Sequence, residues 1–283
     1  ANSFTTRQER ELIDRCRDNW EAGGDYEYEF NNGSKYRFLF IVNSGQYDST
    51  RERFNVLADR DEKDLFLYSE GRDQERIFRT SYTWDPLTSH GLEMGVERAE
   101  TIRDSDLRLG MAGFGSPSLN HGNLPPISID NSDSIVKEMR YENFLVHNWR
   151  VSDKVSVESS LIYETSNIKQ TGDIFSKRDF DFLRPKIDYR YDITQSTQLR
   201  AKIEKRVSQL SFRDFSASSD SQDDDQNTQA GNPEIVQEQS WEYSLNLEYR
   251  LPNNLGVFNS ELYYRDIEDV IDLVNVSTSP DDL

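Results

Sequence analysis

The chain has a single cysteine, Cys16, and no apolar run long enough for a transmembrane helix. One cysteine excludes an intrachain disulfide and a cysteine-based zinc site. Basic residues are also few: 33 Lys and Arg stand against 52 Asp and Glu, a formal net charge of −19. This balance argues against a nucleic-acid partner, because binding phosphates needs a basic surface. A transmembrane β-barrel is not excluded, since its strands are only half apolar.

Groupings of residues that carry catalysis or bind metals are also lacking. The three histidines, His90, His121 and His147, fall in different segments and favour no metal or catalytic site. The run Gly113-Phe114-Gly115-Ser116 lacks the spacing of a nucleophile elbow or a phosphate loop. The acidic run at Asp220 and Asp223–Asp225 lacks the alternate spacing of a calcium loop and favours a solvated loop. The sequence therefore predicts no catalytic residue, no metal, no cofactor and no enzyme activity.

Alternation of apolar and polar residues is what the chain has in abundance. Aromatic residues make up 12% of it although its mean hydropathy is −0.83. From Trp241 to Leu251 every odd position is apolar and every even position is polar. Side chains of a strand alternate between its faces, so this segment predicts a strand with one apolar face. Its length and its aromatic residues near both ends are typical of a strand that crosses a membrane at a tilt. A long hairpin in a soluble sandwich would also have an apolar face.

The same alternation recurs along the chain between turn sequences, among which Asn32-Gly33 is a strong hairpin signal. The strands expected are 18–30, 35–47, about 78–84, 90–109, 134–151, 155–164, 186–191, 199–207, 241–251 and 257–276. Short turns are expected near 31–34, 85–89, 152–154, 193–196 and 252–256, and long loops near 48–73, 110–133, 167–179 and 211–238.

Short periplasmic turns that alternate with long extracellular loops are typical of outer-membrane barrels. The sequence therefore predicts an all-β fold over residues 1–283, a single partial domain of an antiparallel up-and-down transmembrane barrel with about ten strands. The outer parts of the 48–73 segment can prolong the strands beside it.

The segment 199–271 resembles the TonB-dependent outer-membrane receptors. The match begins with Gly231-Asn232-Pro233-Glu234 and continues through Glu238 and Ser240 into the alternating strand. The return strand carries Tyr264-Arg265-Asp266, similar to the family's Tyr-Arg-Asp-Ile pattern. Two departures, Ile235-Val236-Gln237 for Leu-Lys-Pro and Gln209-Leu210 for Arg-Pro, leave the subfamily and the substrate open.

The resemblance implies the central portion of a plugged barrel of about 22 strands, with the plug and the C-terminal strands outside this chain. It implies an outer-membrane location among outer-membrane lipids. It also implies active uptake of a scarce bulky ligand, such as a ferric siderophore or other nutrient, driven by the TonB system through the plug. Ala1–Gln8 lacks the basic start and apolar core of a signal peptide, so a membrane assignment requires a longer protein.

Contacts with an extracellular small molecule or chelate are expected in the long loops and the upper lumen, where aromatic and Arg side chains can hold an anionic or planar ligand. The candidates are Phe114, His121, Phe212, Arg213 and Phe215. The polar faces of the last strands would point into the lumen for solvation and pairing (Arg200, Lys202, Glu204, Arg206, Glu242, Glu248 and Arg250). Two other functions stay open: a passive outer-membrane channel or structural barrel, and a soluble carbohydrate-binding β-sandwich.

Overall fold

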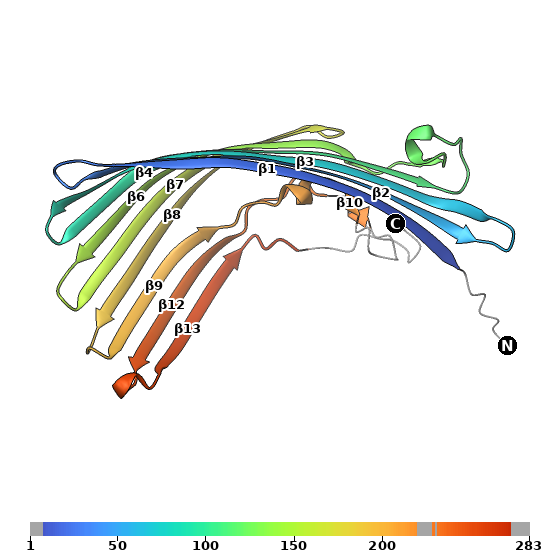
Figure 1. The fold of residues 1–283 in the computed structure, drawn as a ribbon. Helices are drawn as coiled ribbons and strands as arrows, with labels where there is room; N and C mark the ends of the chain where they lie inside the picture. The colour runs from blue at the N-terminus through green and yellow to red at the C-terminus, as the bar shows by residue number, and fades with distance from the viewer. Residues whose placement is uncertain (1–7, 220–227, 230, 273–283) are drawn as a thin grey trace.

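The computed structural model describes residues 8–219, 228–229 and 231–272. These residues form one curved antiparallel sheet of 11 strands, in which each long strand pairs with the next along the chain (Figure 1). The long strands are β1 (Glu9–Glu29), β2 (Lys35–Val56), β3 (Asp61–Leu87), β4 (His90–Met111), β6 (Asp133–Arg150), β7 (Val155–Gly172), β8 (Ser176–Asp192), β9 (Thr197–Val207), β12 (Gln239–Arg250) and β13 (Val257–Glu268).

Shorter elements lie in the connections. β5 (Pro126–Ile127) pairs with β4, and β10 (Ser218–Ser219) pairs with β11 (Thr228–Gln229). The 3-10 turns are η1 (Leu119–His121), η2 (Phe212–Phe215) and η3 (Pro252–Asn254). The all-β, up-and-down, partial-barrel fold predicted from the sequence is confirmed. Within the described residues, no helix has the length and apolarity needed to cross a membrane.

The sheet is apolar on its convex face and polar on its concave face. In β12 the outward residues from Trp241 to Tyr249 are 37% to 44% exposed, while Glu242, Ser244 and Asn246 on the other face are less exposed. The register keeps neighbouring strands in phase, because Tyr243 lies opposite Ile203 on one side and Tyr264 on the other. A water-soluble sheet has the reverse pattern, so the convex face requires an apolar solvent.

The apolar band on the convex face has a height close to that of the apolar band of outer-membrane barrels. In β12 it runs from Trp241 to Tyr249 and in β1 from Trp20 to Tyr28. At about 3.4 Å per residue each stretch covers roughly 27 Å along the strand. A strand tilt of about 40° reduces this to roughly 20 Å of height, near the ~25 Å band of outer-membrane barrels. Aromatic residues mark both edges of the band, as expected for girdles at the two interfaces.

Two of the four expected long loops are strand instead. β2 continues to Val56 and β3 begins at Asp61, so in 48–73 only residues 57–60 connect the strands. β7 continues to Gly172 and β8 begins at Ser176, so 167–179 is also mostly strand. Both segments have polar residues on both faces and therefore no alternation, although the hydrogen-bonded ladder continues. The expected strand 18–30 is longer for the same reason and begins at Glu9.

The other two long connections are not regular strand. Residues 112–132 join β4 to β6 through η1 and β5, and residues 208–238 join β9 to β12 through η2, β10 and β11. The second is here called the β9–β12 connection, and its described residues lie on the concave side of the arch (Figure 1). The acidic run at Asp220 and Asp223–Asp225 and the expected strand end at 273–276 lie outside the described residues. At the opposite end of the sheet the strands are joined by short turns, at 30–34, 88–89, 151–154, 193–196 and 251–256.

Candidate functional site

A hollow of about 680 Å³ lies on the concave face near the ends of the strands that carry the long connections. Its wall combines the sheet with the β9–β12 connection, through Tyr47 and Arg103 on one side and Arg213 and Asp214 on the other. We call it the upper hollow. The Arg103 guanidinium binds both oxygens of Asp73 at 2.8 and 2.9 Å and donates to the Tyr47 hydroxyl at 3.0 Å. The hollow is therefore polar and charged.

The β9–β12 connection is anchored to the sheet by apolar packing. Phe212 and Phe215 stack edge to face, with ring centroids 6.1 Å apart, and are 9% and 2% exposed. They pack with Leu210 against Val136 of β6 and Ile168 of β7. Burial of two phenylalanine side chains stabilises the docked loop by several kcal/mol, at about 1.5–3 kcal/mol each.

A buried amide network adds a second anchor. The Gln170 amide nitrogen donates to Asn131 Oδ1 at 2.8 Å, to Ser134 Oγ at 2.9 Å and to the Phe215 carbonyl at 3.2 Å. The Asn131 side chain also donates to the Phe215 carbonyl, and the Asn131 carbonyl accepts from the Ala217 amide. Gln170 is 1% and Asn131 2% exposed. Because a buried polar group that loses its partners is costly, this network holds one loop position.

The Gly-Asn-Pro-Glu motif closes the β9–β12 connection on itself. Gly231 has a φ of +70°, and a Cβ there would lie 2.7 Å from the Phe215–Ser216 backbone. The Asn232 amide donates to the Asp214 carbonyl at 2.6 Å, and Asn232 Oδ1 accepts from the Glu234 amide at 2.9 Å. Arg178 of β8 donates to the Ile235 carbonyl at 2.7 Å just beyond the motif. These residues hold the loop in position, so the motif acts in the structure through packing and hydrogen bonds.

The five ligand candidates from the sequence do not form one site. Arg213 lines the upper hollow, whereas Phe212 and Phe215 are core side chains that present almost no surface. Phe114 is fully exposed in the β4–β6 connection, and His121 lies there within 3.2 Å of Ser118 Oγ. The sequence singled out aromatic residues of polar loops, but it carries no signal for which of them pack onto the sheet.

Burial changes the ionisation of one carboxyl group at the upper hollow. Desolvation raises the pKa of Asp214 above its ordinary value of 3.8, with no other cause. Asp133, at the start of β6 on the same end of the sheet, also has a raised pKa. Burial is the larger cause, and the negative charges of Asp173, Asp106 and Asp104 add to it. Both carboxyl groups therefore hold their proton to a higher pH than an aspartate side chain free in water does.

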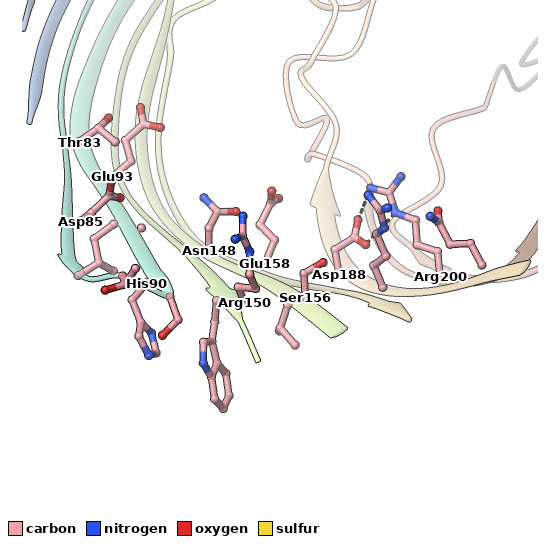
Figure 2. Close-up of a pocket in the computed structure, with 18 residues that line it drawn as sticks. Thr83, Asp85, His90, Glu93, Asn148, Arg150, Ser156, Glu158, Asp188 and Arg200 are labelled. Atoms are coloured by element: carbon pink, nitrogen blue, oxygen red, sulfur yellow. Dashed lines mark hydrogen bonds and ion pairs between the residues drawn. The ribbon is translucent and has the colours of Figure 1, made fainter. Parts of the chain in front are cut away.

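A second hollow, of about 620 Å³, lies on the concave face near the short turns, and Figure 2 shows the side chains around it. We call it the lower hollow. Glu158 and Asp188 point into it, while His90 points to the other side of the sheet (Figure 2). Asp188 receives both a 2.8 and a 2.6 Å hydrogen bond from Arg200, and Glu158 accepts from Lys186 at 2.8 Å. Arg200 therefore lies on the concave face and pairs with Asp188, as the sequence predicted.

A chain of ion pairs separates the two hollows along the concave face. Arg140 of β6 lies between Glu97 and Glu142, at 3.6 and 3.4 Å. Arg184 of β8 lies between Glu142 and Glu164, at 3.0 and 3.2 Å. All five side chains are less than 20% exposed, so the middle of the concave face is held together by compensated charge.

The remaining predicted residues have structural positions. Arg265 of the return strand binds Glu242 at 2.8 Å on the concave face, and Tyr264 lies beside Tyr243 on the convex face. Asp266 lies opposite Trp241.

The histidines are less isolated than the sequence indicated, because His90 Nδ1 and His147 Nε2 are 2.8 Å apart across β4 and β6. In the described part of the chain no three His, Cys, Asp or Glu residues are grouped to hold a metal.

Comparison with known proteins identifies the protein family that has this geometry. A family model described as TonB dependent receptor-like, beta-barrel, matches residues 2–283. No curated protein matches the chain. Among solved structures, the alcaligin outer-membrane receptor FauA of Bordetella pertussis aligns at a TM-score of 0.55 and 12% identity, over 96% of this chain and 41% of that one.

Two further solved structures show the same fold. The ferric yersiniabactin uptake receptor FyuA of Yersinia pestis aligns at a TM-score of 0.54 and 12% identity, over 91% of this chain and 37% of that one. The copper transporter OprC aligns at a TM-score of 0.54 and 12% identity, over 84% and 39%. The chain thus spans about two fifths of the length of the structures it matches.

Proposed function

Because this chain belongs to the TonB-dependent receptor β-barrel family of the Gram-negative outer membrane, we propose that it forms part of the wall of an active uptake receptor. The family consists of receptors and transporters rather than enzymes. The ligand enters at the end of the sheet that carries the two long connections, and the short turns face the periplasm. The observation that carries this proposal is the inside-out sheet, apolar on its convex face, with an anchored loop over a polar upper hollow.

The proposed ligand is a scarce, bulky chelate such as a ferric siderophore. The solved relatives include receptors whose titles name alcaligin and ferric yersiniabactin, but also a copper transporter, so the fold by itself selects no ligand. Support comes from the upper hollow, where Arg17 and Arg213 have no ion-pair partner among the described residues. Guanidinium groups bind anionic oxygens in pairs, which suits a negatively charged chelate.

The lower hollow has a different proposed partner. It holds Asp85, Glu93 and Arg150, none of which has a side-chain partner within the described ranges. In a plugged barrel, polar groups at this level contact the plug, through which the TonB system acts. We assign the free charges of the lower hollow to that contact, and those of the upper hollow to the ligand.

The alternative of a soluble β-sandwich is wrong, because the chain belongs to a membrane family and no second sheet covers the convex face in the part of the chain described. A passive channel is the remaining alternative, and energised uptake distinguishes the two. Cells that carry the receptor should accumulate the chelate only while the inner membrane is energised. A passive channel would equilibrate it without energy.

The test uses the full-length receptor in detergent and a panel of ferric hydroxamate, catecholate and carboxylate chelates, with tryptophan fluorescence as readout. We expect one class to bind and Arg213→Gln to weaken its binding about tenfold, the size of a lost charge-assisted contact. The matched control Arg190→Gln, at the lower hollow, should bind normally. Equal affinities of the two variants, or no binding by any chelate, would contradict the proposal.

A further inference from the structure

Two of the three histidines of the chain meet on the convex face near the short turns. His90 is the first residue of β4, and His147 lies near the end of β6. Figure 2 shows His90 on the opposite side of the sheet from the lower hollow. We call these two residues the histidine pair. Ionisable side chains on a membrane-facing surface are rare and mark functional sites, so the pair calls for a role other than packing.

The register explains why the two rings meet. Trp149 of β6 lies directly opposite His90, and Leu92 of β4 lies directly opposite His147. The two histidines are therefore diagonal neighbours, which lie about 7–8 Å apart in an antiparallel pair and within reach of long or aromatic side chains. Both side chains are half-buried, so their rings can turn without disturbing a packed core.

The two imidazole rings lie edge to edge in one plane. Nδ1 of His90 and Nε2 of His147 are 2.8 Å apart, the ring planes differ by 3° and the ring centroids are 5.1 Å apart. The centroid separation equals the distance between the nitrogens plus one ring radius at each end, so both nitrogens lie on the line that joins the two rings. In the neutral pair the N–H of one ring therefore donates to the lone pair of the other.

No charged side chain lies directly opposite either histidine in the described sheet. The opposite residues are Leu87, Leu92, Trp149 and Ser159. The Trp149 ring lies 5.6 Å from the His90 ring and within 13° of parallel to it. The charged residues closest in sequence, Glu93 and Arg150, line the lower hollow on the concave face. A cation bound by the histidine pair would therefore meet no opposing cation from the paired strands.

The histidine pair lies at the edge of the apolar band next to the short turns. On β4 the outward residues beyond His90 are Leu92 and Met94, whereas on its other side the chain turns at 88–89. Trp84, directly opposite Leu92 on β3, is an aromatic residue of the same edge. Since such residues mark the interface between a membrane and water, water and dissolved ions reach the histidine pair from the side of the turns.

We propose that the histidine pair chelates a divalent transition-metal ion of the class that prefers imidazole, such as Zn²⁺, and so links β4 to β6. Zn²⁺ binds imidazole nitrogens at about 2.0–2.1 Å, and tetrahedral coordination sets two of them roughly 3.3–3.4 Å apart. From its present 2.8 Å the pair needs to open by only about 0.5 Å. The proton of the hydrogen bond moves to the other nitrogen of its own ring, so both imidazoles bind in the neutral form. The other coordination positions are open to water.

Two ligands suffice for this site because adjacent strands hold them together. Once one imidazole binds the ion, the second is already within reach, which raises its effective concentration. The pairing of β4 with β6 is continuous from His90 to Asp106, so no segment has to become ordered when the ion binds. Imidazole favours Zn²⁺ and Cu²⁺ over Mg²⁺, which prefers oxygen ligands. The site is independent of the identity of the imported ligand.

The experiment uses the full-length receptor in detergent, purified without a histidine tag and freed of metal with a chelator. The variants are His90→Gln and His147→Gln, and the matched control is His121→Gln in the β4–β6 connection. Zinc sulfate is titrated by calorimetry, with magnesium sulfate as the comparison salt. Hydrogen exchange of the Arg150 amide, which donates to the Ser89 carbonyl at 2.8 Å, reports order beside the pair. Electron paramagnetic resonance with one equivalent of Cu²⁺ counts the nitrogen ligands.

The wild type and the control should bind one Zn²⁺ that either variant binds at least about tenfold more weakly, because a chelate loses its advantage with one ligand removed. Zinc, but not magnesium, should slow exchange of the Arg150 amide in the wild type and the control only. Both variants should lose a pair of nitrogen ligands from the Cu²⁺ spectrum. Equal zinc affinity in the wild type and both variants would reduce the pair to a hydrogen bond and overturn the proposal. A wild-type Cu²⁺ spectrum without paired nitrogen ligands would overturn it as well, whatever the stability of the variants.

Discussion

The lower and upper halves of the long strands have the same backbone but different surroundings. In the lower half of β2, from Tyr36 to Val42, every outward residue is apolar and partly exposed, and Leu39 and Ile41 on the concave face are apolar as well. In the upper half, from Ser44 to Val56, charged residues occupy both faces, yet β2 pairs with β3 throughout. An apolar convex face therefore marks the half of the sheet that lies in lipid, and in β12 polar residues alternate with this apolar face from Trp241 to Tyr249. Where water lies on both sides of the sheet, the hydrogen-bonded ladder continues although apolar and polar residues do not alternate.

Different interactions hold the two halves. The lower half needs lipid against its convex face and compensated charge against the lumen. The upper half relies on cross-strand ion pairs, such as Arg53 with Asp64 and Lys63 with Glu52, at 2.9 and 2.5 Å. It also packs under the β9–β12 connection through Leu65, Leu67 and neighbouring residues. The predictions below act on one half at a time.

The largest effect is expected in the apolar band. Leu245→Arg places a charge at mid-height of β12 on the lipid side and should cost about 2–4 kcal/mol of unfolding free energy. The neighbouring Asn246→Arg faces the lumen and should cost less than about 1 kcal/mol, because its charge stays hydrated. Chemical unfolding of the full-length receptor in bilayers measures both. Equal costs would mean that the convex face does not contact lipid.

The anchored loop comes next in magnitude. Gly231→Val combines a positive φ with a Cβ in contact with the Phe215–Ser216 backbone, so the docked loop should lose about 1–3 kcal/mol. The control is Gly113→Val, because no atom lies within 4 Å of a Cβ at Gly113. Hydrogen exchange of the Asn232 amide, bonded to the Asp214 carbonyl, reports docking. Unchanged protection in Gly231→Val would show that the motif does not anchor the loop.

A smaller effect is expected from the ion pairs of the upper half. Arg53 donates two hydrogen bonds to Asp64, at 3.2 and 2.9 Å, and both side chains are about 10% exposed. Asp64→Asn should cost about 1 kcal/mol of local stability, and the exposed control Glu62→Gln should cost less than about 0.5 kcal/mol. Hydrogen exchange across residues 51–67, at low and high salt, separates the two. If Leu245→Arg also increased hydrogen exchange across residues 51–67, the lower and upper halves of the strands would not be independent.

The smallest effect is a pH dependence at the upper end. The pKa of Asp133 is raised, so the folded state binds its proton more tightly than the unfolded state does. The charged Asp133 carboxylate destabilises the folded state in full at neutral pH. This destabilisation is relieved as the pH falls through the raised pKa of Asp133 towards the ordinary value of 3.8. Exchange of the Asp173 amide, which donates to the Asp133 carbonyl, should slow slightly at pH 4.5 relative to pH 7 after correction for intrinsic rates. Asp133→Asn should remove this dependence.

The contrast between the two halves also explains which strands could be predicted from the sequence and which could not. Strands with lipid on one side and lumen on the other alternate, so the hairpin from Trp241 onward and the all-β barrel were predictable. The upper strands of 48–73 and 167–179 were not, because polar residues occur on both of their faces. These upper strands pair because the register of the lower halves continues upward through them.

The candidate site was the least predictable part. Phe212 and Phe215 were expected to contact the ligand, but both are buried against Val136 and Ile168, about 45 to 80 positions away in the sequence. The amide network through Gln170 joins three segments of the chain in the same way, and a single glutamine in an alternating strand carries no sign of it. Gly231 was found because its motif is specific.

The most direct test of the inside-out sheet is a scan of nitroxide labels in the full-length receptor reconstituted in bilayers. The exposed free Cys16 is first replaced by serine. Labels at Tyr243, Leu245 and Leu247 should collide with oxygen dissolved in lipid, and labels at Ser244 and Asn246 with a water-soluble nickel chelate. Labels at Arg72 and Gln74, outward in the upper half of β3, should all meet the nickel chelate. Uniform water access along 241–249 would contradict the account, and period-two alternation confined to the lower halves is what it predicts.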